Sequence, residues 1–454
     1  MANSEITEAL GQEKIGKLLL QYSLPAIIAT AASSLYNIID RVFIGHGVGP
    51  LAISGLALTF PLMNLAAAFG SLVGAGASTM VSIRLGQRDR KGATLILGNA
   101  VFLNLLLGTL FSVFALSFLD DLLKILGASK NTLPYAREFM QIILLGNVLT
   151  HLYIGLNNVM RASGYPKKAM LTTLLTVGVN LILAPLFIFV FKWGIRGAAT
   201  ATVCAQFVGT VRVLIHFMKQ SSLVHFLPGY FKPKIKIIRD IFSIGMSNFL
   251  MLICATLVTL IINLSLSKYG GDFAIGAYGI INSIGMLFAM IVLGFNQGMQ
   301  PISGYNYGAQ KFHRVISVFK YTLAAGTCVT TFGFLLSEIF PAQIAGCFTS
   351  NDQLIKIAVI GLRFNLAMFP IVGFQMVTSN FFQSIGKAKI SIFLSLSRQV
   401  LFFIPALLVL PHFFGLNGVW CGAPVADFIS SLVTLIVLQT QIKKIRIQSK
   451  FLRK

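Results

Sequence analysis

Charged side chains are scarce in this chain of 454 residues: Asp, Glu, Lys and Arg together make up 11% of it, and only 13 residues are acidic. Hydrophobic residues account for 56%, and the mean hydropathy is +0.82. So few charges cannot cover the surface of a water-soluble fold that contains this much apolar material. The composition therefore excludes an ordinary soluble domain and indicates a protein that crosses a membrane repeatedly.

Residue patterns of metal sites and hydrolases are missing as well. The five cysteines are scattered, odd in number and without a CxxC pair, so they indicate neither a disulfide framework nor a zinc site. The six histidines are dispersed and show no HExxH spacing. We therefore expect that the protein is not an enzyme and holds no metal.

Long apolar runs dominate the sequence instead. Crossing a hydrocarbon core of roughly 30 Å takes a helix of about 20 apolar residues. Twelve segments reach this length, near 17–44, 52–82, 92–119, 133–157, 168–191, 195–218, 239–267, 274–302, 315–340, 354–380, 389–411 and 416–441. Several are longer than needed, so we expect tilting, or bending at prolines such as Pro25, Pro61 and Pro405. The sequence predicts an all-α integral membrane protein with twelve transmembrane helices.

Lys and Arg residues are distributed unevenly between the two sides of the predicted helices. About 25 of the 36 lie on one set of alternate connections and about nine on the other, so the positive-inside rule makes the first set cytoplasmic. The tails 1–16 and 442–454 are then both cytoplasmic, and the polar opening does not have the order of a cleavable signal peptide. The net charge of +23 is spread over several segments, which favours contact with anionic lipid over a nucleic-acid partner.

An internal repeat divides the chain into two halves. Four pairs of landmarks recur 220 to 222 residues apart: Gly86 with Gly308, Gly164 with Gly386, Pro185 with Pro405, and Gly197 with Gly418. Each half holds six predicted helices, an even number, so both halves enter the membrane in the same orientation and form a parallel repeat. We therefore predict an N-lobe at 17–218, a cytoplasmic linker at 219–238 and a C-lobe at 239–441.

Apart from Glu138 and Asp240 at the helix ends, three acidic residues fall within the predicted helices: Asp40, Asp427 and, close to the outer boundary, Glu338. A charged carboxylate at the centre of a bilayer costs about 2.5–3.5 kcal/mol on insertion scales, so each of the three needs an explanation. Glu338 lies beside Pro341 and is most simply an interfacial residue.

Two interpretations of Asp427 stay open. Asp427 and Arg398 fall at a similar depth in adjacent predicted helices, so the two charges can neutralise each other. Asp427 can instead bind a cationic substrate, released from Arg398 in one state of the protein. The repeat-related position in the first half is Gln206, which is polar but uncharged. The predicted substrate-binding residues are therefore Asp427, Arg398 and Gln206.

Several stretches together resemble the MATE (multidrug and toxic compound extrusion) family of transporters. They are LYNIIDRVFIG at 35–45, RASG at 161–164, VNLILAPLFI at 179–188, GIRGAATAT at 194–202 and GFNQGMQPISGYNYGA at 294–309. The C-terminal stretch 397–427 is most similar to the MepA-like bacterial branch. The resemblance implies two six-helix lobes in a bacterial inner membrane, acting as a monomer by alternating access. It further implies export of small, amphipathic, mostly cationic compounds in exchange for protons or sodium ions, with no other cofactor.

The resemblance also implies a coupling site in the N-lobe, with one departure from the family pattern. Family members with such a site join an aspartate on helix 1 to an asparagine and a second aspartate on helix 5. Asp40 and Asn180 fit this pattern, but the position of the second acid is Ala184. Other members use acids on helices 7 and 10, and the matching segments 246–266 and 362–382 contain none. The carboxylate of Asp40 must then carry more of the ion coupling alone.

The residues around Asp40 indicate a polar pocket. Three polar residues precede it and share or border its helical face: Ser33, Tyr36 and Asn37. Burial in such a pocket favours the neutral carboxyl, which can bind a proton from one side and release it to the other. The predicted ion-coupling residues are Asp40, Asn180, Tyr36, Asn37, Asn157 and Thr202. The competing interpretation is an aspartate at the helix end that pairs with Arg41, although neighbours on a helix point in different directions.

A function of another class also fits repeated helix bundles, namely a lipid-linked oligosaccharide flippase of the related superfamily. Such a flippase should line its cavity with several cationic residues that hold a pyrophosphate. Away from the helix ends, the embedded bases evident in the sequence are Arg212 and Arg398. This small number favours the exporter.

Overall fold

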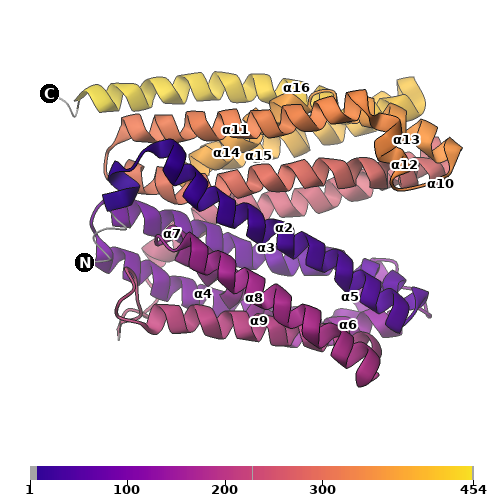
Figure 1. Ribbon diagram of the computed structural model, residues 1–454, viewed down its shortest axis with the longest axis horizontal. Coiled ribbons are helices and arrows are strands. Elements are labelled where there is room, and N and C mark those ends of the chain that lie inside the picture. Colours follow the sequence, from indigo (N-terminus) through magenta and orange to yellow (C-terminus); the bar gives the residue numbers. More distant parts are fainter. Residues whose placement is uncertain (1–7, 228, 452–454) are drawn as a thin grey trace. The chain divides into compact units, whose positions relative to one another are not determined.

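The computed structural model describes residues 8–227 and 229–451, and its regular secondary structure in these ranges is helical (Figure 1). Contacts within the chain divide it into two compact units. Unit 1 contains Ile28–Leu252, and unit 2 contains Glu13–Ile27 together with the chain from Ile253 onward. Two long helices, α2 (Ile15–Gly47) and α10 (Ile235–Gly308), therefore each contribute to both units.

The remaining helices follow the chain in order. Unit 1 holds α3 (Pro50–Gly86), α4 (Arg90–Ser117), α5 (Leu119–Ile125), α6 (Leu133–Leu145), α7 (Asn147–Ala162), α8 (Pro166–Pro185), the π-helical η1 (Leu186–Val190) and α9 (Gly194–Met218). Unit 2 holds α11 (Phe312–Ile339), α12 (Pro341–Gly346), α13 (Asp352–Asn365), α14 (Phe369–Ser384), α15 (Ala388–Leu396), the π-helical η2 (Ser397–Phe403) and α16 (Ile404–Phe451).

Twelve membrane crossings can be counted in the described ranges. Nine helical segments there are long and apolar enough to span a bilayer, and two bent pairs, α6 with α7 and α13 with α14, each add one broken span. One of the nine, Ala388–Lys444, has 57 residues, which corresponds to about 85 Å of helix. The backbone turns within it at Gly415, where φ is 56° and ψ is −134°, so this segment supplies two crossings. The predicted all-α fold with twelve transmembrane helices is confirmed.

Two predicted spans are broken in the structure. The segment predicted as one helix at 133–157 is α6 followed by α7, bent by 55° at Gly146, and the segment predicted at 354–380 is α13 followed by α14, bent by 52°. The short helices α5 and α12 were not predicted because an apolar run of that length cannot cross a bilayer. Pro405 lacks an N–H and its ring crowds the preceding turn, which accounts for the wide π-helical turn η2 just before it.

The connection between α9 and α10 is packed on unit 1. The backbone N–H of Leu223 donates to the hydroxyl of Tyr165 (3.1 Å), and that of Lys234 donates to Oδ1 of Asn99 (2.8 Å). Helix α10 begins at Ile235, inside the predicted linker 219–238. The compact units differ from the predicted lobes at 17–218 and 239–441, because unit 1 extends to Leu252 in α10 and unit 2 includes Glu13–Ile27, the first part of α2.

Close approach of two backbones holds α10 on α3. A Cβ atom on Gly245 would overlap the carbonyl oxygen of Leu72, and one on Gly76 would overlap that of Ile241. Only glycine allows this approach, since every other residue would force the helices apart.

We therefore expect Gly245→Ala to loosen this packing and to lower the free energy of unfolding by about 1–3 kcal/mol. Gly279→Ala is the matched control, because Gly279 lies in the same helix with no atom near the position of its Cβ. The control should be neutral or stabilising by up to about 1 kcal/mol. Thermal unfolding of the two detergent-solubilised variants compares them, and equal stabilities would contradict the close packing.

Candidate functional site

Three polar side chains from three helices of unit 1 meet next to Asp40. The hydroxyl of Tyr36 on α2 lies 3.1 Å from Oγ1 of Thr202 on α9. The amide Nδ2 of Asn180 on α8 donates to both of these oxygens, at 3.1 Å each. We call Asp40, Tyr36, Asn180 and Thr202 the outer cluster, because the predicted topology places it in the outer half of the membrane.

Asp40 is buried beside this network. Asp40 is 8% exposed, and its Oδ1 atom has no hydrogen-bond partner in the described structure. Asp40 lies one helical turn after Tyr36, close enough for an electrostatic interaction. Arg41 does not pair with it in the described structure: the guanidinium carbon of Arg41 lies 4.4 Å from the ring centre of Phe60. Arg41 is therefore close enough to Asp40 for an electrostatic interaction but forms no salt bridge with it in the described part of the chain.

Apolar residues occupy the side of the site where the family pattern has a second acid. Ala184 is fully buried one turn after Asn180, and it belongs to a core cluster with Ile44, Leu62 and Ile188. Asp40 is therefore the one acidic side chain of the outer cluster.

Two further predicted residues lie apart from the outer cluster. Asn157 on α7 donates from Nδ2 to Oγ1 of Thr173 on α8 (3.2 Å), and Tyr153 donates its hydroxyl hydrogen to the same oxygen (3.1 Å). We call Asn157, Thr173 and Tyr153 the inner cluster. Asn37 is exposed and donates to the carbonyl of Ser33 in its own helix.

Sequence reasoning missed Thr173 and Tyr153, although a signal for both was present. Thr173 precedes Asn180 by two helical turns on α8, and Tyr153 precedes Asn157 by about one turn on α7, so each shares a face with a residue already singled out.

Three buried oxygen atoms in these clusters have no hydrogen-bond partner in the protein: Oδ1 of Asp40, Oδ1 of Asn157 and Oδ1 of Asn180. Buried polar groups are ordinarily satisfied, so each such acceptor points to a small polar species that the site can take up. A water molecule, a proton on the carboxylate or a small hard cation all suit oxygen acceptors. The arrangement can therefore take up a water molecule, a proton or a small hard cation.

In unit 2, Arg398 and Asp427 form an ion pair. Nε of Arg398 on η2 lies 2.5 Å from Oδ1 of Asp427 on α16, with the side chains 25% and 4% exposed. The pairing interpretation of Asp427 therefore describes this structure. Gln206, the repeat-related residue in unit 1, accepts a hydrogen bond from the hydroxyl of Thr150. Substrate binding by these residues stays a prediction.

Glu338 is partly exposed and pairs with Arg363 across 3.8 Å. This surface ion pair agrees with the interfacial role predicted for Glu338.

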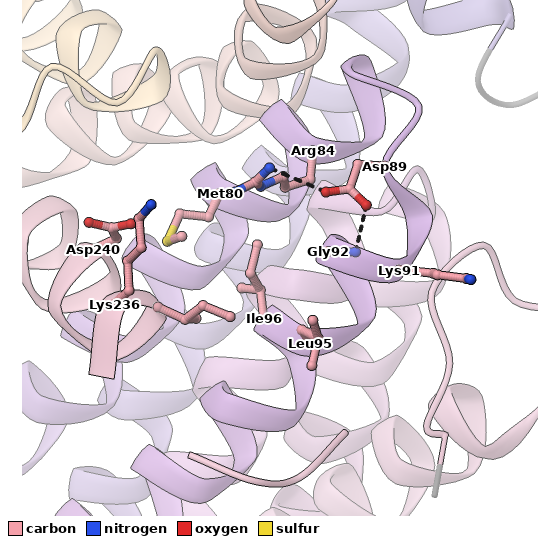
Figure 2. Close-up of a pocket in the computed structure, with 10 residues that line it drawn as sticks. Met80, Arg84, Asp89, Lys91, Gly92, Leu95, Ile96, Lys236 and Asp240 are labelled. Carbon is pink, nitrogen blue, oxygen red and sulfur yellow. Dashed lines mark hydrogen bonds and ion pairs between the residues drawn. The ribbon is translucent and has the colours of Figure 1, made fainter. Parts of the chain in front are cut away.

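A cavity of about 260 Å³ lies elsewhere in unit 1, between the end of α3, the start of α4 and the start of α10 (Figure 2). Its lining contains none of the predicted site residues. Asp89 there accepts from the backbone N–H of Gly92 (2.8 Å) and pairs with Arg84 (3.2 Å). Asp89 thus caps the N-terminus of α4, a structural role.

The model of the MatE protein family matches two stretches of the sequence, residues 25–186 and 248–408. Together they cover more than half of the chain. The chain belongs to this family. The two stretches are offset by about 222 residues, the spacing of the landmarks in the sequence, so the family match also reproduces the parallel repeat. MATE proteins are membrane transporters, and the predictions of the family and of a protein that is not an enzyme are confirmed.

Curated relatives match this MATE protein over nearly its full length. It is 28% identical over 424 residues to "Multidrug export protein MepA" of Staphylococcus aureus (strain NCTC 8325 / PS 47), covering 93% of each chain. It is 27% identical over 427 residues to the MepA protein of Staphylococcus haemolyticus (strain JCSC1435), covering 94% of each chain. The MepA-like character predicted from residues 397–427 is confirmed.

Solved structures share its fold. A crystal structure of MATE in the bent conformation superposes with a TM-score of 0.92 at 24% identity, covering 98% of this chain and 99% of that one. A MOP superfamily transporter from Pyrococcus furiosus, described as having a binding pocket of reverse polarity that suggests a different function, gives a TM-score of 0.91 at 24% identity and covers 96% of this chain and 98% of that one.

Proposed function

We propose that this MATE protein is a secondary active multidrug exporter, driven by ion entry at Asp40. The observation that carries the proposal is the outer cluster: a buried carboxylate with an unpartnered oxygen, next to a hydrogen-bonded network of Tyr36, Asn180 and Thr202. A carboxylate inside a membrane protein is costly unless function requires it. The names of the MepA relatives support multidrug export.

The coupling ion in this proposal is the proton. Asp40 supplies one negative charge to the outer cluster, and Ala184 stands where a second carboxylate would add another. A sodium ion must replace its hydration shell with several oxygen ligands, and losing one charged ligand weakens this exchange. A single buried carboxyl can still bind and release a proton, since burial favours its neutral form.

Coupling then follows from the hydrogen bonds around Asp40. Ionised Asp40 can only accept hydrogen bonds, whereas protonated Asp40 can donate one. Proton binding therefore changes which partners Asp40 holds within the cluster of α2, α8 and α9. Because interfaces between packed helices are bistable, such a local change can favour one of two lobe arrangements. The lobes alternate between opening outward and opening inward as substrate leaves.

Substrates in this proposal are amphipathic, mostly cationic organic compounds. Binding of the cation by Asp427 requires release from Arg398, since the pair is closed in this structure. The flippase alternative gains little support, because Asp427 neutralises Arg398 and Arg212 is exposed. We also propose that the protein acts as a monomer in a bacterial inner membrane, with cytoplasmic termini and anionic lipid at that face.

The test is accumulation of a fluorescent organic cation in drug-sensitive bacteria. We expect cells that express the protein to hold less dye than cells with an empty vector, and we expect collapse of the proton gradient to remove the difference. Collapse of the sodium gradient alone should leave it unchanged. Equal accumulation with and without the protein would contradict export, and sensitivity to sodium alone would replace the proton as the coupling ion.

A further inference from the structure

Arg161 is a buried cation without a carboxylate partner. Arg161 lies in the last turn of α7 and is 8% exposed. Its hydrogen bond, from Nη1 to Oδ1 of Asn158 in the same helix, is long at 3.4 Å. No acidic side chain in the described part of the chain forms an ion pair with it. An unpaired buried charge is strongly destabilising, so its presence calls for a function.

The outer and inner clusters lie along one face of α8. Asn180 of the outer cluster follows Thr173 of the inner cluster by seven residues, which is two helical turns or about 10 Å. Each cluster also contains an asparagine oxygen without a protein partner, on Asn180 and on Asn157. Water molecules between the clusters can satisfy both oxygens. Water molecules bridging this distance of about 10 Å would join the two clusters into one polar track along α8.

Arg161 stands at the end of this track opposite to Asp40. It follows Asn157 by one helical turn on α7 and interacts electrostatically with Tyr153, whose hydroxyl bonds Thr173 of the inner cluster. The predicted helix ends at residue 157, so the predicted topology places Arg161 at the cytoplasmic end of this span. Along the track, the outer cluster with Asp40 comes first and the inner cluster follows. Arg161 comes last and lies nearest to the cytoplasm.

We propose that Arg161 is an electrostatic barrier that stops the coupling ion from leaking along the track into the cytoplasm. A fixed positive charge in a low-dielectric interior repels protons and sodium ions alike, as arginines do in selective pores. An ion bound at Asp40 can then reach the cytoplasm only through the transport cycle. This inference rests on the proposed function of Asp40 as the ion site, and it assigns to the chain a separate activity, the prevention of uncoupled ion flow.

The test measures proton entry without substrate. Purified protein is reconstituted into liposomes that contain a pH-sensitive dye, and a pH step is applied. We expect Arg161→Gln to raise the leak about tenfold over the wild type, since the repulsion between the two charges is lost. Arg161→Lys is the matched control and should keep the leak low. A leak at the wild-type level in folded Arg161→Gln would overturn the proposal.

A second variant separates the barrier from a structural role. Thr173→Val in the Arg161→Gln background removes a hydroxyl from the inner cluster and should suppress the leak. Because Arg161→Gln removes an unpaired charge, the melting temperature of this variant should be unchanged or higher. If Arg161 had a purely structural role, Arg161→Gln would have a lower melting temperature and no leak. A leak that persists at full size in the double variant would overturn the track.

The proposed function and the barrier can fail independently. If Asp40→Asn loses export and Arg161→Gln shows the proton leak of the wild type, the coupling role is supported and the barrier is rejected. A leaking Arg161→Gln variant together with wild-type export by Asp40→Asn would support the barrier and reject the coupling role.

Discussion

Asp40→Asn is expected to reduce export to the background of cells that lack the protein, with normal amounts of the variant in the membrane. Asparagine keeps the size of the side chain and much of its hydrogen bonding, but it cannot bind or release a proton. The outer cluster should therefore stay assembled, since Tyr36, Asn180 and Thr202 bond one another directly. Dye efflux from drug-sensitive cells measures the effect.

The matched control for this change is Asp121→Asn. Asp121 is an exposed acid of the short helix α5, outside the predicted site. Its replacement removes the same charge and should leave efflux at the wild-type rate. Export at the wild-type rate by Asp40→Asn, at equal membrane expression, would end the coupling role of Asp40.

Breaking the ion pair of unit 2 is expected to destabilise the protein, and unequally for its two members. Arg398→Gln should lower the free energy of unfolding by about 3–5 kcal/mol, because it leaves the nearly inaccessible carboxylate of Asp427 unpaired. Asp427→Asn should cost less, because the side chain of Arg398 is 25% exposed and that of Asp427 only 4%. The double variant should recover much of the loss, since no unpaired charge remains.

The free energies of unfolding of the wild type, the two single variants and the double variant together give a double-mutant cycle. The pair of Glu338 and Arg363 is the control, because it is longer at 3.8 Å and more exposed. Its coupling energy should stay within about 1 kcal/mol, the range of surface pairs. Additive effects of Arg398→Gln and Asp427→Asn would show that the two residues do not stabilise each other.

The fold could be predicted from the sequence to a large extent because bilayer physics constrains it strongly. An apolar run of sufficient length must be helical, since the backbone has no other way to satisfy its polar groups in lipid. The repeat landmarks, such as Gly164 with Gly386, then fixed two halves of six helices. The breaks at Gly146 and between α13 and α14 escaped prediction, because hydropathy is the same on both sides of a bend.

The candidate site could be predicted in part. Asp40 stood out because a carboxylate is rare in an apolar helix, and Tyr36 followed from helical spacing. Asn180 and Thr202 were placed beside them by family resemblance and by the polar character of their helices, and the structure brings all of these together. Arg161 was not singled out, because its position in a basic cytoplasmic segment made its charge look like topology.

The sequence by itself determined the class of protein, the number of crossings, the repeat and the rarity of buried acids, since these depend on composition and on spacing along the chain. The tertiary structure decided which polar side chains meet. It separated Asn157 from the outer cluster, paired Arg398 with Asp427 and left Arg161 without a carboxylate. These outcomes depend on how helices distant in sequence rotate and pack against each other, and no periodicity within one helix contains that information.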